Sequence, residues 1–146
     1  MGTNERQAQR GRSLSPSTAA GERMPKYILI VDDHEQLRKL VRAYLEHEGG
    51  FIVCGEAVDG FDALEKAETL KPDLIVLDLS MPKMSGIEAA PRLKKMLPRT
   101  PIIMLTSYQT ALRNHDAISL GIDAVIAKGG DMTLLANSVQ NLLQRA

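Results

Sequence analysis

The sequence has one cysteine, no net charge and no long apolar run, and each of these shortages excludes a class of protein. Cys54 has no partner for an internal disulfide, and its apolar neighbours favour a buried structural thiol in a reducing cytoplasm. A formal net charge of zero gives no reason to expect that the chain as a whole binds nucleic acid. No apolar run approaches the roughly 20 residues of a membrane helix. We therefore expect a cytoplasmic protein that binds neither membrane nor nucleic acid through this chain.

The beginning of the chain also lacks what a folded segment needs. Residues 1–23 are rich in Gly, Ser, Arg and Gln, and Leu14 is their only large aliphatic residue. Such a composition cannot bury enough apolar surface to offset the entropy of ordering, and it contains no apolar core of a signal peptide. We predict a disordered tail over residues 1–24 and one folded domain over residues 25–146.

Beyond the tail, short aliphatic runs alternate with segments in which apolar residues recur every three or four positions. The runs predict buried strands, and the recurring pattern predicts amphipathic helices. The expected strands lie at residues 27–31, 51–57, 73–78, 102–105 and 124–127, and a helix follows each of them. Five strands alternating with five helices predict an α/β fold, a doubly wound five-stranded parallel sheet with the flavodoxin-like strand order 2-1-3-4-5.

Helix boundaries are indicated by residues that cap or interrupt helices. Asp33 is expected to cap the first helix, and Ser85 with Glu88 three residues later forms a capping box for the third. Pro91 is awkward in that helix, since an internal proline removes a backbone hydrogen bond, so we expect a kink or a late start there. A weakly patterned fourth helix is expected over residues 110–120.

Five polar residues stand where the predicted strands end. They are Asp32 and Asp33 after the first strand, Asp78 after the third, Thr106 after the fourth and Lys128 after the fifth. Right-handed crossovers bring the carboxyl ends of parallel strands to one edge of a sheet, where ligands bind. We therefore expect these side chains to form one cluster.

Three neighbouring carboxylates predict a bound cation. Like charges at close range repel and raise one another's pKa, and a single lysine offsets only one of them. Carboxylate oxygens suit Mg²⁺, which keeps open positions for water and phosphate. An aspartate can accept a phosphoryl group as an acyl phosphate, with Mg²⁺, Lys128 and Thr106 each available to one phosphoryl oxygen.

These residues, in this order, resemble the receiver domain of two-component response regulators. The resemblance covers about residues 26–145, which is the whole chain apart from the tail. It rests on the acid pair Asp32–Asp33, on Asp78 followed by Met81–Pro82 and Gly86, on Thr106 with the small Ser107, and on Lys128.

The resemblance implies that Asp78 accepts a phosphoryl group from a histidine kinase, a phosphotransfer protein or a small acyl phosphate. It implies that Asp33 and Asp78 ligate Mg²⁺ together with the backbone carbonyl of Ser80, while Asp32 acts through metal-bound water. Lys128 would bind a phosphoryl oxygen, and Thr106 would move toward the phosphate as a switch.

A protein of this kind is a phosphorylation-switched binding module, not an enzyme for a diffusible substrate. It would catalyse only its own phosphorylation and dephosphorylation. The resemblance implies a downstream protein partner on the face formed by the fourth helix, the fifth strand and the fifth helix. The chain would be a monomer or a phosphorylation-dependent dimer, and a piece of a longer regulator is a further possibility.

Two positions differ from the family pattern and leave alternatives open. Val125 stands where an aromatic residue is common, and Gly129 stands where proline is common after the lysine. The chain could therefore be a degenerate receiver that acts as a scaffold or connector. A small phosphatase with an aspartate nucleophile is a second alternative, although such enzymes normally have an acid at the position of Ser80. His34, next to the acid pair, could border the site.

Overall fold

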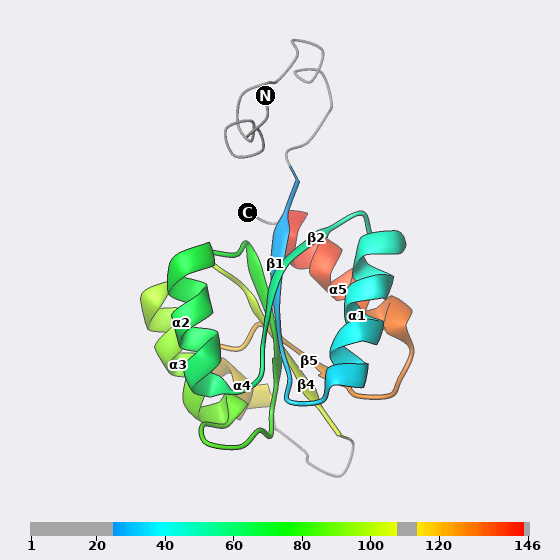
Figure 1. Cartoon of the computed structure of the whole chain (residues 1–146). Helices are drawn as coiled ribbons and strands as arrows, with labels where there is room; N and C mark the ends of the chain where they lie inside the picture. The colour runs from blue at the N-terminus through cyan, green and yellow to red at the C-terminus, as the bar shows by residue number, and fades with distance from the viewer. Residues whose placement is uncertain (1–24, 108–113, 145–146) are drawn as a thin grey trace, which may run out of the picture.

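A five-stranded parallel sheet forms the middle of three layers (Figure 1). The structure is a computed structural model that describes residues 25–107 and 114–144. The strands run in the order β2-β1-β3-β4-β5, which confirms the flavodoxin-like order predicted from the sequence. Their bounds are β1 Tyr27–Val31, β2 Ile52–Ala57, β3 Leu74–Asp78, β4 Ile102–Thr106 and β5 Ala124–Ala127.

Helices cover both faces of the sheet, as a doubly wound fold requires. Helices α1 and α5 lie on one face, and α2, α3 and α4 lie on the other (Figure 1). Their bounds are α1 Glu35–His47, α2 Gly60–Leu70, α3 Gly86–Met96, α4 Asn114–Leu120 and α5 Met132–Gln144. In the part of the chain that the structure describes, no helix combines the length and apolar character that crossing a membrane demands.

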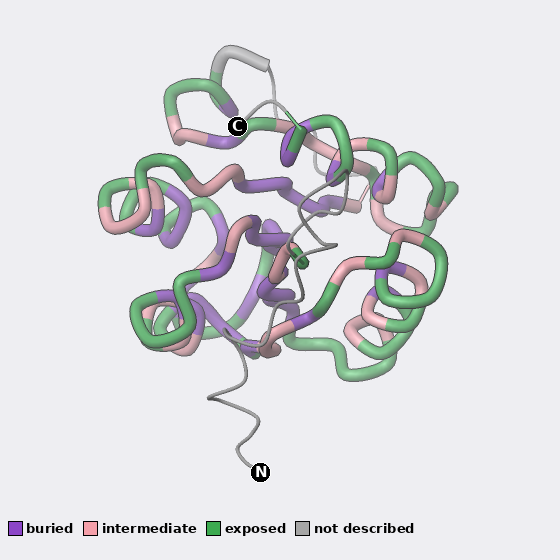
Figure 2. The backbone as a smooth tube through the Cα atoms, turned by 90° about the horizontal axis from the view of Figure 1, so that it is seen from above, coloured by how far each residue is buried: buried purple, intermediate pink, exposed green. Residues whose placement is uncertain are grey.

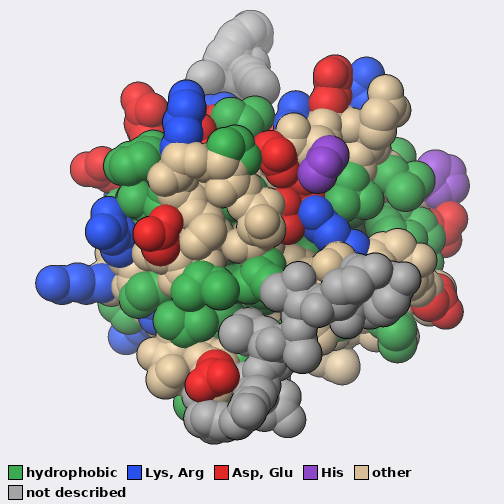
Figure 3. Space-filling view, turned by 90° about the horizontal axis from the view of Figure 1, so that it is seen from below, with side chains coloured by type: hydrophobic (Ala, Val, Ile, Leu, Met, Phe, Trp, Pro, Cys, Tyr) green, Lys and Arg blue, Asp and Glu red, His purple; other side chains and the backbone are tan. Residues whose placement is uncertain are grey.

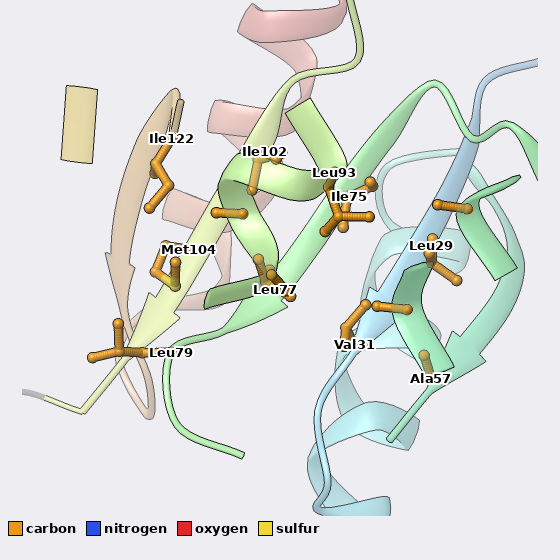
Figure 4. Packing of buried hydrophobic residues seen from close by; sticks show 14 of the residues in the cluster. Leu29, Val31, Ala57, Ile75, Leu77, Leu79, Leu93, Ile102, Met104 and Ile122 are labelled. Atoms are coloured by element: carbon orange, nitrogen blue, oxygen red, sulfur yellow. The ribbon is translucent and has the colours of Figure 1, made fainter. Parts of the chain in front are cut away.

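The core has two halves because successive strand residues point to opposite faces. In β3, Ile75 and Leu77 pack toward α2 and α3, whereas Leu74 and Val76 pack toward α1 and α5. Every residue of β3 and β4 is buried, and the sheet forms the buried centre of the molecule (Figure 2). Figure 4 shows side chains of the half that faces α2 and α3, with Ile75 of β3 close to Leu93 of α3.

Two of the helix boundaries differ from the sequence prediction. Asp33 does not cap α1, because the helix begins one residue later and His34 occupies the N-cap position without a side-chain capping bond. A late start of α3 is also wrong: the capping box of Ser85 and Glu88 is present, and the helix continues through Pro91. Residues 110–113 of the expected fourth helix and the expected tail over residues 1–24 lie outside the described residues.

Candidate functional site

The predicted acidic cluster lies at the carboxyl end of the sheet. The last residue of β1, Val31, pairs with Leu77 of β3, so Asp32 and Asp33 emerge beside Asp78. Figure 3 views this end of the molecule and shows acidic side chains, a histidine and a basic side chain next to one another. The described residues that line the pocket here are Asp33, His34, Asp78, Leu79, Ser80, Met81, Pro82, Ser107 and Lys128.

Lys128 joins the two buried acids of the cluster. Its Nζ lies 2.9 Å from Oδ1 of Asp78 and 3.1 Å from Oδ2 of Asp32. Both aspartates are about 1% exposed, although Asp32 follows β1 and Asp78 ends β3. The lysine follows β5, where its backbone N–H donates to the carbonyl of Thr106 at 2.7 Å. Three strands therefore bring the two carboxylates and the ammonium together.

Burial and charge act in opposite directions on this pair. Loss of solvent raises the pKa of Asp78 and outweighs the hydrogen bond from Lys128, and the charge of Asp32 raises that pKa further. Burial alone would lower the pKa of Lys128, but its hydrogen bond to Asp78 and the charges of both aspartates raise it. The ammonium is thus favoured, while the anionic form of Asp78 is disfavoured until another cation binds nearby.

Among the residues that the structure describes, two buried carboxylate oxygens make no hydrogen bond. They are Oδ2 of Asp78 and Oδ2 of Asp32, although the latter has the ion pair with Lys128. Buried oxygens of this kind are costly unless a hydrogen-bond donor or a cation compensates them. One donor atom each from Asp32, Asp33, His34 and Asp78 lie within 4.8 Å of one another. The residues present therefore fit a divalent cation.

The other predicted metal-site residues lie at the same pocket. The side chain of Asp33 is 31% exposed, so it is the most accessible of the three carboxylates. Ser80 lies in the loop after β3, and its N–H donates to Oδ1 of Asp78 at 3.3 Å. This contact holds the beginning of the loop against the acid.

Thr106 is the last residue of β4, and its hydroxyl makes a hydrogen bond within its own loop. Its hydroxyl is buried and donates to the carbonyl of Ser107 at 3.1 Å. Ser107, which directly follows β4, is one of the described residues that line the pocket. The structure therefore brings the side chains of Asp32, Asp33, Asp78 and Lys128 together, and it shows the Thr106 hydroxyl donating to the carbonyl of the next residue.

His34 is the neighbour that sequence reasoning placed only at the border of the site. Its N–H donates to Oδ1 of Asp32 at 2.8 Å, and its ring Nδ1 lies 3.2 Å from the same oxygen. Nδ1 also lies 3.4 Å from Oδ1 of Asp33. The side chain is 68% exposed and lines the pocket, so the prediction that it borders the site is confirmed.

Contacts away from the pocket hold the acidic loops in position. Arg38 donates from Nη1 to the carbonyl of Asp32 at 2.8 Å and from Nε to Glu56 at 2.8 Å. Gly86 packs closely on the loop that follows Asp78, here called the acceptor loop, so a Cβ at Gly86 would overlap the carbonyl oxygen of Asp78. Arg38 was missed by the sequence analysis, since a helical arginine four residues beyond His34 gives no pattern of its own.

The two positions that depart from the family pattern lie on the β5 side. Val125 is half-buried and packs against the core between the sheet and α2, α3 and α4. Gly129 has a φ of +76°, a conformation that glycine adopts without strain. The turn after Lys128 therefore uses the conformational freedom of glycine where a proline would have a negative φ.

Comparison with known proteins agrees with the geometry. The family described as "Response regulator receiver domain" matches residues 28–140. The response regulator protein VraR of Staphylococcus saprophyticus is 41% identical over 117 residues, which is 80% of this chain and 56% of that protein. VraR of Staphylococcus aureus is 39% identical over 113 residues, 77% of this chain and 54% of that protein. The chain thus spans about half the length of the curated relatives it matches.

Solved structures give the same result. The receiver domain of AraT from Geobacillus stearothermophilus is 31% identical with a TM-score of 0.76, and the match covers 84% of this chain and 95% of that one. A CheY-like receiver domain protein from Methanospirillum hungatei is 30% identical with a TM-score of 0.76, and the match covers 84% and 96%. The fold, the acid cluster and the family match together show that the chain belongs to the response regulator receiver domain family.

Proposed function

We propose that this chain is a phosphorylation-activated receiver that accepts a phosphoryl group on Asp78 and signals through protein–protein contacts. The observation that carries the proposal is the position of Asp78, buried at a strand end with Lys128 at 2.9 Å and with one carboxylate oxygen lacking a hydrogen bond. A carboxylate in this position can attack phosphorus, while the nearby ammonium offsets the charge on the transferred group.

The residues present fit Mg²⁺. Asp33, Asp78 and the backbone carbonyl of Ser80 would hold the ion directly, and Asp32 would act through its water. When bound, Mg²⁺ neutralises charge on the phosphoryl oxygens and orients the group for in-line transfer. This assignment would also compensate Oδ2 of Asp78, the buried oxygen without a hydrogen bond.

The transfer requires only these groups and a phosphorylated donor. A carboxylate oxygen of Asp78 forms a bond to phosphorus, and the bond from phosphorus to the donor nitrogen or oxygen breaks, leaving its electron pair on the donor. The Lys128 ammonium contacts a phosphoryl oxygen and so exchanges part of its contact with Asp78 for the new charge. Thr106 would turn from the carbonyl of Ser107 toward the phosphate, which is the proposed switch.

The proposed donor is a histidine kinase or a phosphotransfer protein in the cytoplasm, and the proposed output is a downstream protein that contacts α4, β5 and α5. Phosphorylation adds close to two negative charges and biases an existing equilibrium between two conformations. The chain would catalyse no reaction other than its own phosphorylation and dephosphorylation. It would act as a monomer or as a phosphorylation-dependent dimer.

The test is incubation with Mg²⁺ and acetyl phosphate, followed by mass spectrometry under acidic conditions. We expect one base-labile phosphoryl adduct, which is absent in Asp78→Asn and without Mg²⁺. The control is Asp59→Asn, because Asp59 is a buried aspartate that caps α2 outside the pocket. An adduct that persists in Asp78→Asn contradicts the site, and turnover of unrelated phosphate esters favours the phosphatase alternative.

A second candidate function is favoured by β5. Val125 cannot make the large rotation of an aromatic side chain, and its packing against the core leaves little room for movement. The chain would then accept phosphate but act as a scaffold or connector with little switching. Amide spectra recorded with and without beryllofluoride and Mg²⁺ distinguish these two functions. Chemical-shift changes throughout residues 102–144 support switching, whereas changes confined to the pocket support the scaffold.

A further inference from the structure

We propose that Arg38 is a positioning residue for phosphorylation: Glu56 of β2 holds its guanidinium, which in turn fixes the backbone of Asp32. The inference rests on the proposed function and extends it to a helix and a strand, α1 and β2, that contribute no described residue to the lining of the pocket. The β2 edge of the sheet thus takes part in a reaction at the centre of the sheet, because the position of the acid pair depends on it.

The guanidinium of Arg38 joins the loop after β1 to strand β2. Its Nη1 donates to the backbone carbonyl of Asp32 at 2.8 Å, and its Nε donates to Oε1 of Glu56, also at 2.8 Å. The Arg38 side chain is 13% exposed, so water competes little for these hydrogen bonds. Because the guanidinium is planar and its N–H groups have fixed directions, the contact with Glu56 determines where Nη1 points.

The carbonyl that Arg38 holds belongs to the peptide group between the two neighbouring acids, Asp32 and Asp33. On the other side of Asp32, its N–H donates to the carbonyl of Ala57 in β2 at 3.0 Å. A peptide group is planar, so fixing its carbonyl also fixes the direction of the Asp33 N–H in the same group. Both sides of Asp32 are therefore held from β2, one directly and the other through Arg38.

Asp32 carries this constraint into the pocket. Its buried Oδ1 accepts the N–H of His34 at 2.8 Å, and its Oδ2 lies 3.1 Å from Nζ of Lys128. The same Nζ lies 2.9 Å from Oδ1 of Asp78. Rotation of the Asp32 carbonyl would change how Lys128 is shared between the two carboxylates, and a displacement of about 1 Å near a reacting centre can lower a rate about 100-fold.

A second arginine of α1 shares the same glutamate. Nη1 of Arg42 donates to Oε2 of Glu56 at 2.7 Å. The other contacts of Arg42 in the described chain are with Glu46 and the carbonyl of Val53, so it does not reach the loop after β1. Burial raises the pKa of Glu56, but the hydrogen bonds and charges of Arg38 and Arg42 outweigh burial and lower it, so the carboxylate stays ionised between them.

The alternative role of Arg38 is purely structural: it would connect α1 to β2 through Glu56 and have no influence on the reaction. Arg42 provides that same connection, since it forms an ion pair with Glu56 but has no contact with Asp32 among the described residues. A structural role makes substitutions of the two arginines alike in effect. A positioning role affects phosphorylation through Arg38 alone.

The experiment follows phosphorylation of the full chain by acetyl phosphate at saturating Mg²⁺, with mass spectrometry of samples taken over time. For Arg38→Met we expect the rate constant to fall about tenfold or more, in the range found when a supporting hydrogen bond is removed. The half-saturating concentration of acetyl phosphate should change less, because Arg38 is not one of the described residues that line the pocket. The matched control, Arg42→Met, should leave the rate constant nearly unchanged.

A second variant, Arg38→Lys, keeps the test valid if Arg38→Met folds poorly. Its ammonium retains the charge next to Glu56 but cannot direct two fixed N–H groups at both oxygens. We expect Arg38→Lys to retain a cooperative transition in urea denaturation and to slow phosphorylation more than Arg42→Met does.

Amide spectra recorded without Mg²⁺ or phosphate test the position of the loop independently of the reaction. The amide resonance of Asp33, in the peptide group that Arg38 holds, should shift in Arg38→Met and stay in place in Arg42→Met. Equal rate constants in these two variants, or an unmoved Asp33 resonance in Arg38→Met, overturn the proposal and leave Asp78 as the acceptor. Absence of any adduct on the unaltered chain instead contradicts the proposed function, and the Asp33 resonance then decides whether Arg38 holds the loop.

Discussion

At the scale of the residue, Asp78 combines a functional position with a cost to stability. Burial raises its pKa despite the contact with Lys128, so the folded state binds a proton at this carboxyl more tightly than the unfolded state does. The ionised form therefore disfavours folding at neutral pH. The same desolvation leaves the carboxylate poorly solvated and ready for a cation or a phosphoryl group.

We accordingly predict that Asp78→Asn raises the free energy of unfolding at pH 7 in the absence of metal, because the substitution removes a buried carboxylate whose ionisation disfavours folding. Lys128 retains Asp32 as a partner at 3.1 Å, so the substitution does not leave the ammonium alone. The difference between the two proteins should shrink as the pH falls through the raised pKa of Asp78.

Urea denaturation at several pH values measures this effect. Glu65→Gln is the control, because it removes one negative charge from an exposed position on α2. A destabilised Asp78→Asn at pH 7, or a difference that does not vary with pH, contradicts the prediction.

At the scale of the element, the acceptor loop depends on the close approach of α3. The N–H of Gly86 donates to the carbonyl of Leu79 at 2.9 Å, and a Cβ at Gly86 would overlap the carbonyl oxygen of Asp78. Because that neighbour is backbone, the loop or the helix has to move to admit a side chain. The first turn of α3 thus sets the position of the acceptor.

We predict that Gly86→Ala destabilises the fold by about 1–3 kcal/mol, in the range of overpacked core positions, and lowers the affinity for Mg²⁺. Thermal denaturation and calorimetric titration measure the two effects. Gly130→Ala is the matched control, since a Cβ there meets its nearest neighbour at an ordinary 3.5 Å. Equal stability of the two variants would show that α3 adapts without cost.

The continuity of α3 through Pro91 has a second testable consequence. Proline has no N–H for the carbonyl of Ile87, yet Ala90 and Leu93 on either side are fully buried and hold the helix against the sheet. We predict that Pro91→Ala raises the free energy of unfolding by about 1–2 kcal/mol, because Pro91 is exposed and the substitution restores a helical hydrogen bond. Urea denaturation checks this, with the exposed neighbour Arg92→Ala as control, and an unchanged or lower stability contradicts it.

The strand ends and helix α3 show which structural features can be predicted from the sequence and which cannot. Strand-end positions were enough to predict that Asp32, Asp78 and Lys128 meet, since the geometry of parallel strands determines it. The sequence was not enough to predict that α3 continues through Pro91, because burial of the neighbouring residues outweighs the unfavourable effect of a proline inside a helix. The orientation of the Thr106 hydroxyl and of the His34 ring depends on side-chain rotation, which a sequence pattern does not specify.

At the scale of the whole molecule, the acidic pocket joins parts that lie far apart in the chain. Asp32 and Asp33 follow β1, Asp78 ends β3 and Lys128 follows β5, so the pocket connects the centre of the sheet with its β5 edge. The two halves of the core share these same strands. A cation bound by the acids would therefore stabilise the molecule as a unit and not one loop alone.

We predict that Mg²⁺ at 100 times its dissociation constant raises the free energy of unfolding by about 2.7 kcal/mol, as expected for a ligand that binds only the folded state. Asp33→Asn should lose most of that gain while keeping nearly the same stability without Mg²⁺, because Asp33 is the most exposed of the three acids at 31%. Glu65→Gln should keep the full gain. Denaturation with and without Mg²⁺ provides the measurement. Circular dichroism at two wavelengths should report the same single transition, because both halves of the core share the strands that the ion connects. A full Mg²⁺ gain in Asp33→Asn would mean that the ion stabilises the fold from some other place.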